Sequence, residues 1–125
     1  MRKMKENACN NKNQKKNPGF LLSAVSSNSG KTAAACGLMS AFKQTGKRVC
    51  ACKYIDPMFH REVLSVDSKN LDLFFSEEEV LKEEYLRHTK DADITITEGV
   101  MGFYDGMSLG SVKGSSYDVA RTLGL

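Results

Sequence analysis

The run from Leu21 to Thr32 constrains the fold of this chain more than any other segment. Apolar residues typical of a strand lead into a loop of small residues, the loop ends in Gly-Lys-Thr, and good helix formers follow. This succession is typical of a phosphate-binding loop, in which backbone N–H groups and the positive end of a helix dipole surround the phosphates of a nucleotide. The segment therefore predicts nucleotide binding.

The residues of this loop have separate expected roles. Lys31 is expected to reach the β- and γ-phosphates, and the Thr32 hydroxyl to hold Mg²⁺. The residues whose backbone is expected to surround the phosphates are Ser27, Asn28, Ser29 and Gly30. Val25 stands where the pattern G-x-x-x-x-G-K-[ST] has its first glycine, and Ala24 is the small residue one place earlier. The alternative is an ordinary Ser/Gly turn before an alanine-rich helix, but the agreement of strand, loop, Lys-Thr and helix favours the phosphate-binding loop.

Composition limits the remaining choices. A chain of 125 residues with a net charge of +3 has room for one domain with a core. Most of the basic excess lies in the first 17 residues, so residues 1–18 are expected to form a disordered basic leader. Because the leader has no interleaved aromatic residues, a solvated tail is favoured over a nucleic-acid-binding arm. No signal-peptide core or membrane-length apolar run is visible, and we expect a cytoplasmic protein with no membrane or nucleic-acid partner.

The cysteines are expected to be reduced and structural. Cys50 and Cys52 lie two residues apart in an expected strand, so they share one face. One C-x-C without a second pair or a histidine cluster is weak evidence for a metal, and buried thiols are favoured. His88, at the end of an expected helix, is assigned a structural role.

The pattern along the chain predicts alternating strands and helices. Strands are expected at 19–25, 48–53 and 94–97, and helices at 30–44, 76–88 and 115–123. Gly46 is expected to stop the first helix, and a capping box of Ser76 and Glu79 to open the second. Residues 54–75 are expected to be a long functional loop. The order implies an α/β fold, with a parallel sheet of three strands and helices on both faces.

Three acids are candidates for a site at the carboxyl edge of this sheet. Asp56, Glu98 and Asp105 each follow or lie near the end of a strand, where ligands bind in such sheets. A carboxylate beside a phosphate is tolerable when Mg²⁺ lies between them. Glu98 is favoured as a metal ligand over a turn acid. For Asp56, which precedes a proline, a plain turn role is equally compatible with the spacing.

Four motifs give the chain a family resemblance. They are Y-I-D-P-x-F-H at 54–60, N-L-D at 70–72, E-G-V-M-G-x-[YF]-D-G at 98–106 and S-S-x-S-G-K-T at 26–32. Together, in their order along the chain, these motifs resemble those of the cobyrinic acid a,c-diamide synthases. The resemblance extends from Gly19 to the last residue.

The resemblance implies a P-loop NTPase-like fold and an ATP- and Mg²⁺-dependent amidoligase of cobalamin biosynthesis. The a and c carboxylates of a corrinoid would become amides through acyl phosphates, with glutamine or ammonia as nitrogen donor. By position, Lys31 and Thr32 would serve ATP and Mg²⁺, Glu98 would bind Mg²⁺, and Asp56 and Asp105 would line the metal and substrate side as catalytic residues with Lys31. A homodimer is compatible with this assignment.

The chain departs from the family in two ways. Cys52-Lys53 stands where members have G-P-D before the tyrosine, which removes one acid of the site. Members are also longer and end in a glutaminase domain. We therefore expect residues 19–125 to be the N-terminal part of a synthetase domain, with a truncated sheet and no amidation by this chain alone.

Three alternatives remain at this point. Two are related P-loop ligases, a nickel-tetrapyrrole a,c-diamide synthase and a dethiobiotin-synthetase-like enzyme. The third is a non-enzymatic partition-type ATP-binding switch, which predicts an extra lysine in K-G-G-x-G-K-[ST]. Residues 25–29 hold no lysine, which argues against the switch.

Overall fold

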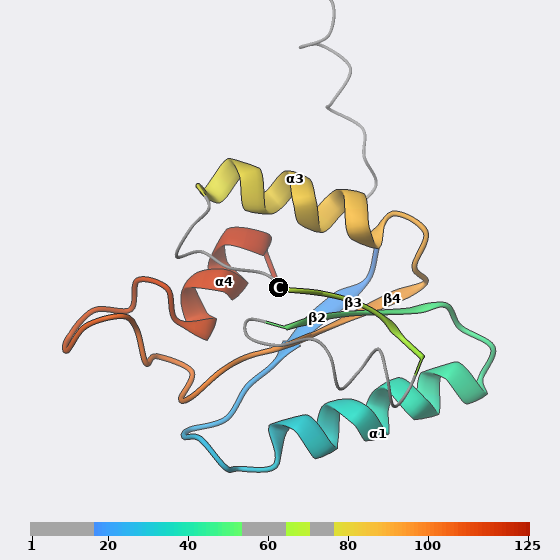
Figure 1. The fold of residues 1–125 in the computed structure, drawn as a ribbon, viewed down its shortest axis with the longest axis horizontal. Helices are drawn as coiled ribbons and strands as arrows, with labels where there is room; N and C mark the ends of the chain where they lie inside the picture. The colour runs from blue at the N-terminus through green and yellow to red at the C-terminus, as the bar shows by residue number, and fades with distance from the viewer. Residues whose placement is uncertain (1–16, 54–64, 71–76) are drawn as a thin grey trace, which may run out of the picture.

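A four-stranded parallel sheet with helices on both faces forms the described part of the chain (Figure 1). The computed structural model describes residues 17–53, 65–70 and 77–125. The strands are β1 (Gly19–Leu22), β2 (Val49–Lys53), β3 (Asp67–Asn70) and β4 (Ile94–Glu98), in the order β1-β4-β2-β3. The helices are α1 (Lys31–Gln44), α3 (Glu78–Thr89) and α4 (Ser116–Leu123). The α/β class and the parallel sheet with helices on both faces are confirmed.

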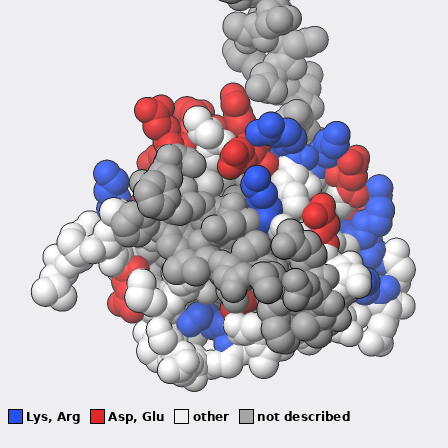
Figure 2. Space-filling model, in the orientation of Figure 1, with Lys and Arg blue, Asp and Glu red and all other residues white. Residues whose placement is uncertain are grey.

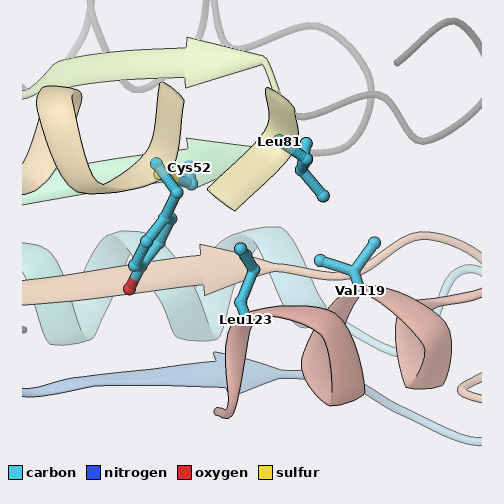
Figure 3. Close-up of a cluster of buried hydrophobic side chains, with 5 residues drawn as sticks. Cys52, Leu81, Val119 and Leu123 are labelled. Carbon is cyan, nitrogen blue, oxygen red and sulfur yellow. The ribbon is translucent and has the colours of Figure 1, made fainter. Parts of the chain in front are cut away.

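Two apolar clusters hold the layers together, one on each face of the sheet. Side chains alternate along β2, so Ala51 faces α1 and Cys52 faces α3. The cluster under α1 contains Ala35, Met39, Ala51, Val66 and Ile96. The cluster under α3 and α4 contains Cys52, Leu81, Tyr85, Val119 and Leu123, most of which Figure 3 labels. Both faces of the sheet are covered, as a parallel sheet requires.

The helix ends follow local chemistry, with one correction. α1 begins directly after Gly30, and Gly46, with φ of 80°, follows its C-cap as expected. α4 begins after Ser115, whose Oγ accepts a hydrogen bond from the backbone N–H of Asp118. The predicted N-cap of α3 is wrong: Glu77 holds this position and makes no side-chain cap bond, and Ser76 lies outside the described residues. Instead, Glu78 and Glu79 in the first turn of α3 interact favourably with the positive end of the helix dipole.

The sheet has one more strand than the sequence predicts. Residues 67–70, expected within a long loop, form β3 and pair in parallel with β2. The sequence Asp-Ser-Lys-Asn has low strand propensity and no apolar alternation, so local signals miss it. Pairing with β2 and the burial of Val66 under α1 determine the position of β3 in the sheet. Polar residues suit a strand at the edge of the described sheet. The rest of the expected loop, 54–64 and 71–75, lies outside the described residues.

The surface of α3 carries both signs of charge. Figure 2 shows red and blue side chains mixed over the α3 side of the molecule. Glu78 of α3 accepts a hydrogen bond from Arg121 of α4 at 2.8 Å, and Glu79 pairs with Lys82 within α3. These exposed pairs are typical of a solvated helix face and contribute little each to stability. No helix among the described residues is long and apolar enough to cross a bilayer.

Leu81→Ala tests the packing of α3 on the sheet. Leu81 is fully buried in the cluster of Figure 3, so we expect a loss of about 2–5 kcal/mol in the free energy of unfolding. Leu109→Ala, at a fully exposed leucine, is the matched control and should change it by less than about 0.5 kcal/mol. Urea unfolding followed by circular dichroism measures both. Equal losses in the two variants would contradict this packing.

Candidate nucleotide-binding site

The phosphate-binding loop curls around the N-terminal end of α1. β1 ends at Leu22, so the expected strand to Val25 is too long by three residues; the Val25 side chain is 93% exposed. Asn28 and Gly30 adopt left-handed backbone angles, with φ of 57° and 79°. Residues 28–32 line a hollow of about 350 Å³. The loop residues expected from the sequence therefore surround one space at a helix N-terminus, where backbone N–H groups and the helix dipole favour an anion.

Hydrogen bonds between two serines stabilise this loop. Ser29 Oγ donates to the Ser26 carbonyl at 2.9 Å and lies 3.1 Å from Ser26 Oγ. Such local bonds stabilise a turn without using the backbone N–H groups. By stabilising the turn, the contacts between Ser26 and Ser29 position the loop around the hollow.

Lys31 connects the loop to the segment after β4. Its Nζ donates to the Ser26 carbonyl at 2.9 Å and to the Met101 carbonyl at 2.8 Å. Hydrogen bonds from an ammonium group to phosphate oxygens are stronger than those to neutral carbonyls. A bound nucleotide could therefore attract this side chain away from its two carbonyl partners.

Thr32 and Glu98 meet across the carboxyl edge of the sheet. The Thr32 hydroxyl donates to Glu98 Oε1 at 2.5 Å, and Glu98 is only 2% exposed at the last position of β4. Burying a carboxylate costs free energy unless charge or hydrogen bonds compensate. Mg²⁺ prefers oxygen ligands such as this hydroxyl and this carboxylate. The structure thus brings together the two residues that the sequence predicts as metal ligands.

The segment after β4 packs closely on the phosphate-binding loop. Phe103 donates its backbone N–H to the Ala24 carbonyl at 2.9 Å. A Cβ on Gly102 would lie 2.6 Å from the Val25 carbonyl oxygen, so only glycine fits without a backbone shift. Ser116 Oγ accepts from the Val100 N–H at 3.0 Å and can donate to the Val100 carbonyl at 3.1 Å. These contacts fix both loops at one edge of the sheet.

The other two predicted acids are placed differently. Asp105 is exposed, and its Oδ2 accepts a hydrogen bond from the backbone N–H of Gly102 at 2.8 Å. This contact shapes its own loop; among the described residues no hydrogen bond joins it to Thr32 or Glu98. Asp56, with the whole Y-I-D-P-x-F-H segment, lies outside the described residues.

Sequence reasoning missed two groups of this structure. Ser116 anchors the segment after β4, but its signal is confined to a polar residue in the first turn of a helix, which many helices share. Cys50, Asp67 and His88 come together on the α3 side of the sheet. Their proximity depends on β3, which the sequence did not predict.

Comparison with known proteins places the chain in a family. A family model described as the CobQ/CobB/MinD/ParA nucleotide binding domain matches residues 20–121. The chain belongs to this family. Together with the relatives described next, this match confirms the motif resemblance, and nucleotide binding by this domain implies ATP.

Several curated relatives are similar to the chain. Cobyrinate a,c-diamide synthase of Fusobacterium nucleatum is 42% identical over 106 residues, which cover 85% of this chain and 23% of the relative. The protein of the same name from Priestia megaterium is 38% identical over 108 residues, which cover 83% of this chain and 24% of the relative. Hydrogenobyrinate a,c-diamide synthase of Brucella ovis is 40% identical over 112 residues, which cover 86% of this chain and 25% of the relative. The chain thus spans roughly a quarter of these relatives. No solved structure matches it.

Lys31→Ala tests the nucleotide site. Loss of one charge-assisted hydrogen bond, about 1.5–3 kcal/mol, should weaken ATP–Mg²⁺ binding on the order of tenfold or more. Lys47→Ala is the matched control, because Lys47 lies beyond the opposite end of α1. Isothermal titration calorimetry measures both affinities. An unchanged affinity in the Lys31 variant would contradict the assignment.

Proposed function

We propose that this chain provides the ATP-binding part of an amidoligase that converts the a and c carboxylates of a corrinoid to amides in cobalamin biosynthesis. The observation that carries the proposal is the contact of Thr32 with the buried Glu98, beside Lys31 and at the start of the family's E-G-V-M-G-x-[YF]-D-G motif. The curated relatives described above have corrinoid names, which favours a corrinoid over a nickel tetrapyrrole as substrate.

The site residues suit the activation of a carboxylate by ATP. A carboxylate is a poor electrophile, so its oxygen attacks the γ-phosphorus, ADP leaves, and the resulting acyl phosphate is open to ammonia. Ammonia, free or derived from glutamine, then displaces inorganic phosphate and leaves the amide. Two anions must approach in the first step, so the catalyst acts mainly by neutralising charge and positioning groups.

Each residue has a specific part in this proposal. The backbone of residues 27–30 would bind phosphate oxygens, and Lys31 would exchange its carbonyl partners for the β- and γ-phosphates. Thr32 and Glu98 would hold Mg²⁺, which when bound neutralises charge on the phosphates. Asp105 would act on the substrate side, oriented by its bond to Gly102, and Asp56 is proposed there from its motif alone.

Glu98→Gln tests the metal role of the buried carboxylate. The amide keeps the shape and an acceptor for Thr32 but removes the charge, so the gain in ATP affinity on adding Mg²⁺ should fall at least tenfold. Calorimetric titration of ATP with and without Mg²⁺ gives this gain. Glu79→Gln, at an exposed acid of α3, is the control and should retain it. The same Mg²⁺ dependence of ATP binding in Glu98→Gln and Glu79→Gln would contradict the assignment of Glu98 as a metal ligand.

A chimera tests the reaction itself. Residues 20–121 would replace the matching segment of the Fusobacterium nucleatum relative, and the product would be incubated with cobyrinic acid, ATP, Mg²⁺ and ammonium. We expect mono- and diamide by mass spectrometry, more slowly than with the relative because G-P-D is absent before Tyr54.

One control completes the chimera experiment. Lys31→Ala in the chimera should abolish the amides, because it removes the cation that is proposed to bind the phosphates. A folded chimera that binds ATP and yields no amide would overturn the proposed function.

A further inference from the structure

Three side chains of the types that bind Zn²⁺ meet on the α3 side of the sheet. They come from separate elements: Cys50 from β2, Asp67 from β3 and His88 from the end of α3. One ligand atom of each lies within 4.8 Å of the other two. Cys50 and Asp67 are partners in the parallel pairing of β2 and β3, so both side chains point to the same face. That face is the one covered by α3.

The spacing of these atoms is close to that of a metal site. Around a tetrahedral zinc ion, ligand atoms at about 2.0–2.3 Å from the metal lie roughly 3–4 Å from one another. His88 Nδ1 lies 3.9 Å from Asp67 Oδ2, within this range. Cys50 Sγ lies 3.8 Å from the backbone carbonyl of His88, next to the imidazole. The remaining pairs of ligand atoms lie within 4.8 Å, so they must approach by about 1 Å at most to reach this range.

Charge and donor type also fit zinc. A thiolate and a carboxylate together carry two negative charges, which balance a divalent ion when the imidazole is neutral. Sulfur and nitrogen donors favour Zn²⁺ over Mg²⁺ or Ca²⁺. Cysteine binds a metal as the thiolate, so metal binding at Cys50 would release the thiol proton.

The two nitrogens of His88 differ in their surroundings. Nδ1 lies 3.9 Å from Asp67 Oδ2 and is the atom that an ion shared with this carboxylate would bind. Nε2 is buried and has no hydrogen-bond partner among the described residues. With an ion on Nδ1, the neutral imidazole carries its proton on Nε2.

The cluster is open to solvent on one side. The Asp67 side chain is 79% exposed, and a hollow of about 280 Å³ adjoins the imidazole, lined by Lys69, Glu84, Arg87 and His88. An ion can thus reach the cluster without unfolding of the sheet. Cys50 pairs with Thr95, three residues before Glu98 along β4, so the cluster lies about 10 Å along the strands from the nucleotide-binding edge.

We propose that Cys50, Asp67 and His88 bind one Zn²⁺ ion that pins the edge strand β3 to β2 and α3. Among the described residues, pairing with β2 and burial of the adjacent Val66 hold this short polar strand in the sheet. A metal that joins three elements binds the folded chain more tightly than the unfolded one and therefore stabilises the fold.

Cobalt substitution tests the site in the full chain. The reduced, chelator-treated protein would be titrated with Co²⁺, because thiolate–cobalt bonds give a near-ultraviolet charge-transfer band and tetrahedral Co²⁺ gives strong visible bands. We expect one equivalent of Co²⁺ to produce both, and Zn²⁺ to displace it. Cys50→Ser should abolish the charge-transfer band, and Asp67→Asn should weaken Co²⁺ binding at least tenfold.

Two variants serve as matched controls. Cys36→Ser changes a half-buried thiol on α1, outside the cluster, and should keep the full band. Glu98→Gln removes the carboxylate at the nucleotide site and should also keep it, which separates this inference from the proposed function. Zn²⁺ should raise the melting temperature of the unsubstituted chain more than that of Asp67→Asn.

The exposed Asp67 keeps the test decisive even if Cys50→Ser fails to fold, since its amide leaves the core intact. A folded chain without a charge-transfer band would overturn the proposal. So would a band that survives both Cys50→Ser and Asp67→Asn, because the ion would then lie elsewhere.

Discussion

The register of β4 between β1 and β2 is the constraint on which the site depends. Glu98, the last residue of β4, is level with Leu22 at the end of β1 and with Lys53 at the end of β2. Three strand ends therefore lie at one height, and the segments that leave them start from the same edge. A shift of one residue would turn Glu98 to the opposite face of the sheet and separate its carboxylate from Thr32. The positions of Glu98 and of the phosphate-binding loop relative to each other therefore depend on this register.

Charged groups at this edge are held by contacts that a ligand would replace. The Glu98 carboxylate accepts from the Thr32 hydroxyl, and the Lys31 ammonium donates to two carbonyls, one from each loop. Both charged groups are thus oriented in advance by these hydrogen bonds. Because a phosphate or a cation interacts more strongly with such groups than a neutral partner does, binding requires little rearrangement of the loops themselves. The glycine contact at Gly102 and the anchor at Ser116 keep the two loops in position during that exchange.

Local sequence signals predicted the parts of this fold that local physics decides. The phosphate-binding loop, α1 with its stop at Gly46, and α4 with its start near Ser115 each depend on residues close together in the chain. β3 was missed because Asp-Ser-Lys-Asn becomes a strand only through hydrogen bonds to β2. The pair Thr32–Glu98 was predicted from topology, since parallel strands end at one edge. Ser116 and the cluster of Cys50, Asp67 and His88 required tertiary contacts that no periodicity encodes.

The two ends of the sheet offer different donor atoms, and this difference would keep two divalent ions apart. At the carboxyl edge, Thr32 and Glu98 present oxygen only, which suits Mg²⁺ shared with a nucleotide's phosphates. About 10 Å away along the strands, Cys50 and His88 add sulfur and nitrogen, which bind Zn²⁺ far better than Mg²⁺. An ion that tightens β3 on β2 would also steady Lys53, the β2 residue level with Glu98, because both belong to the same hydrogen-bonded ladder. A structural metal at one end of β2 would thus support, through the strand itself, the edge at which the nucleotide is proposed to bind.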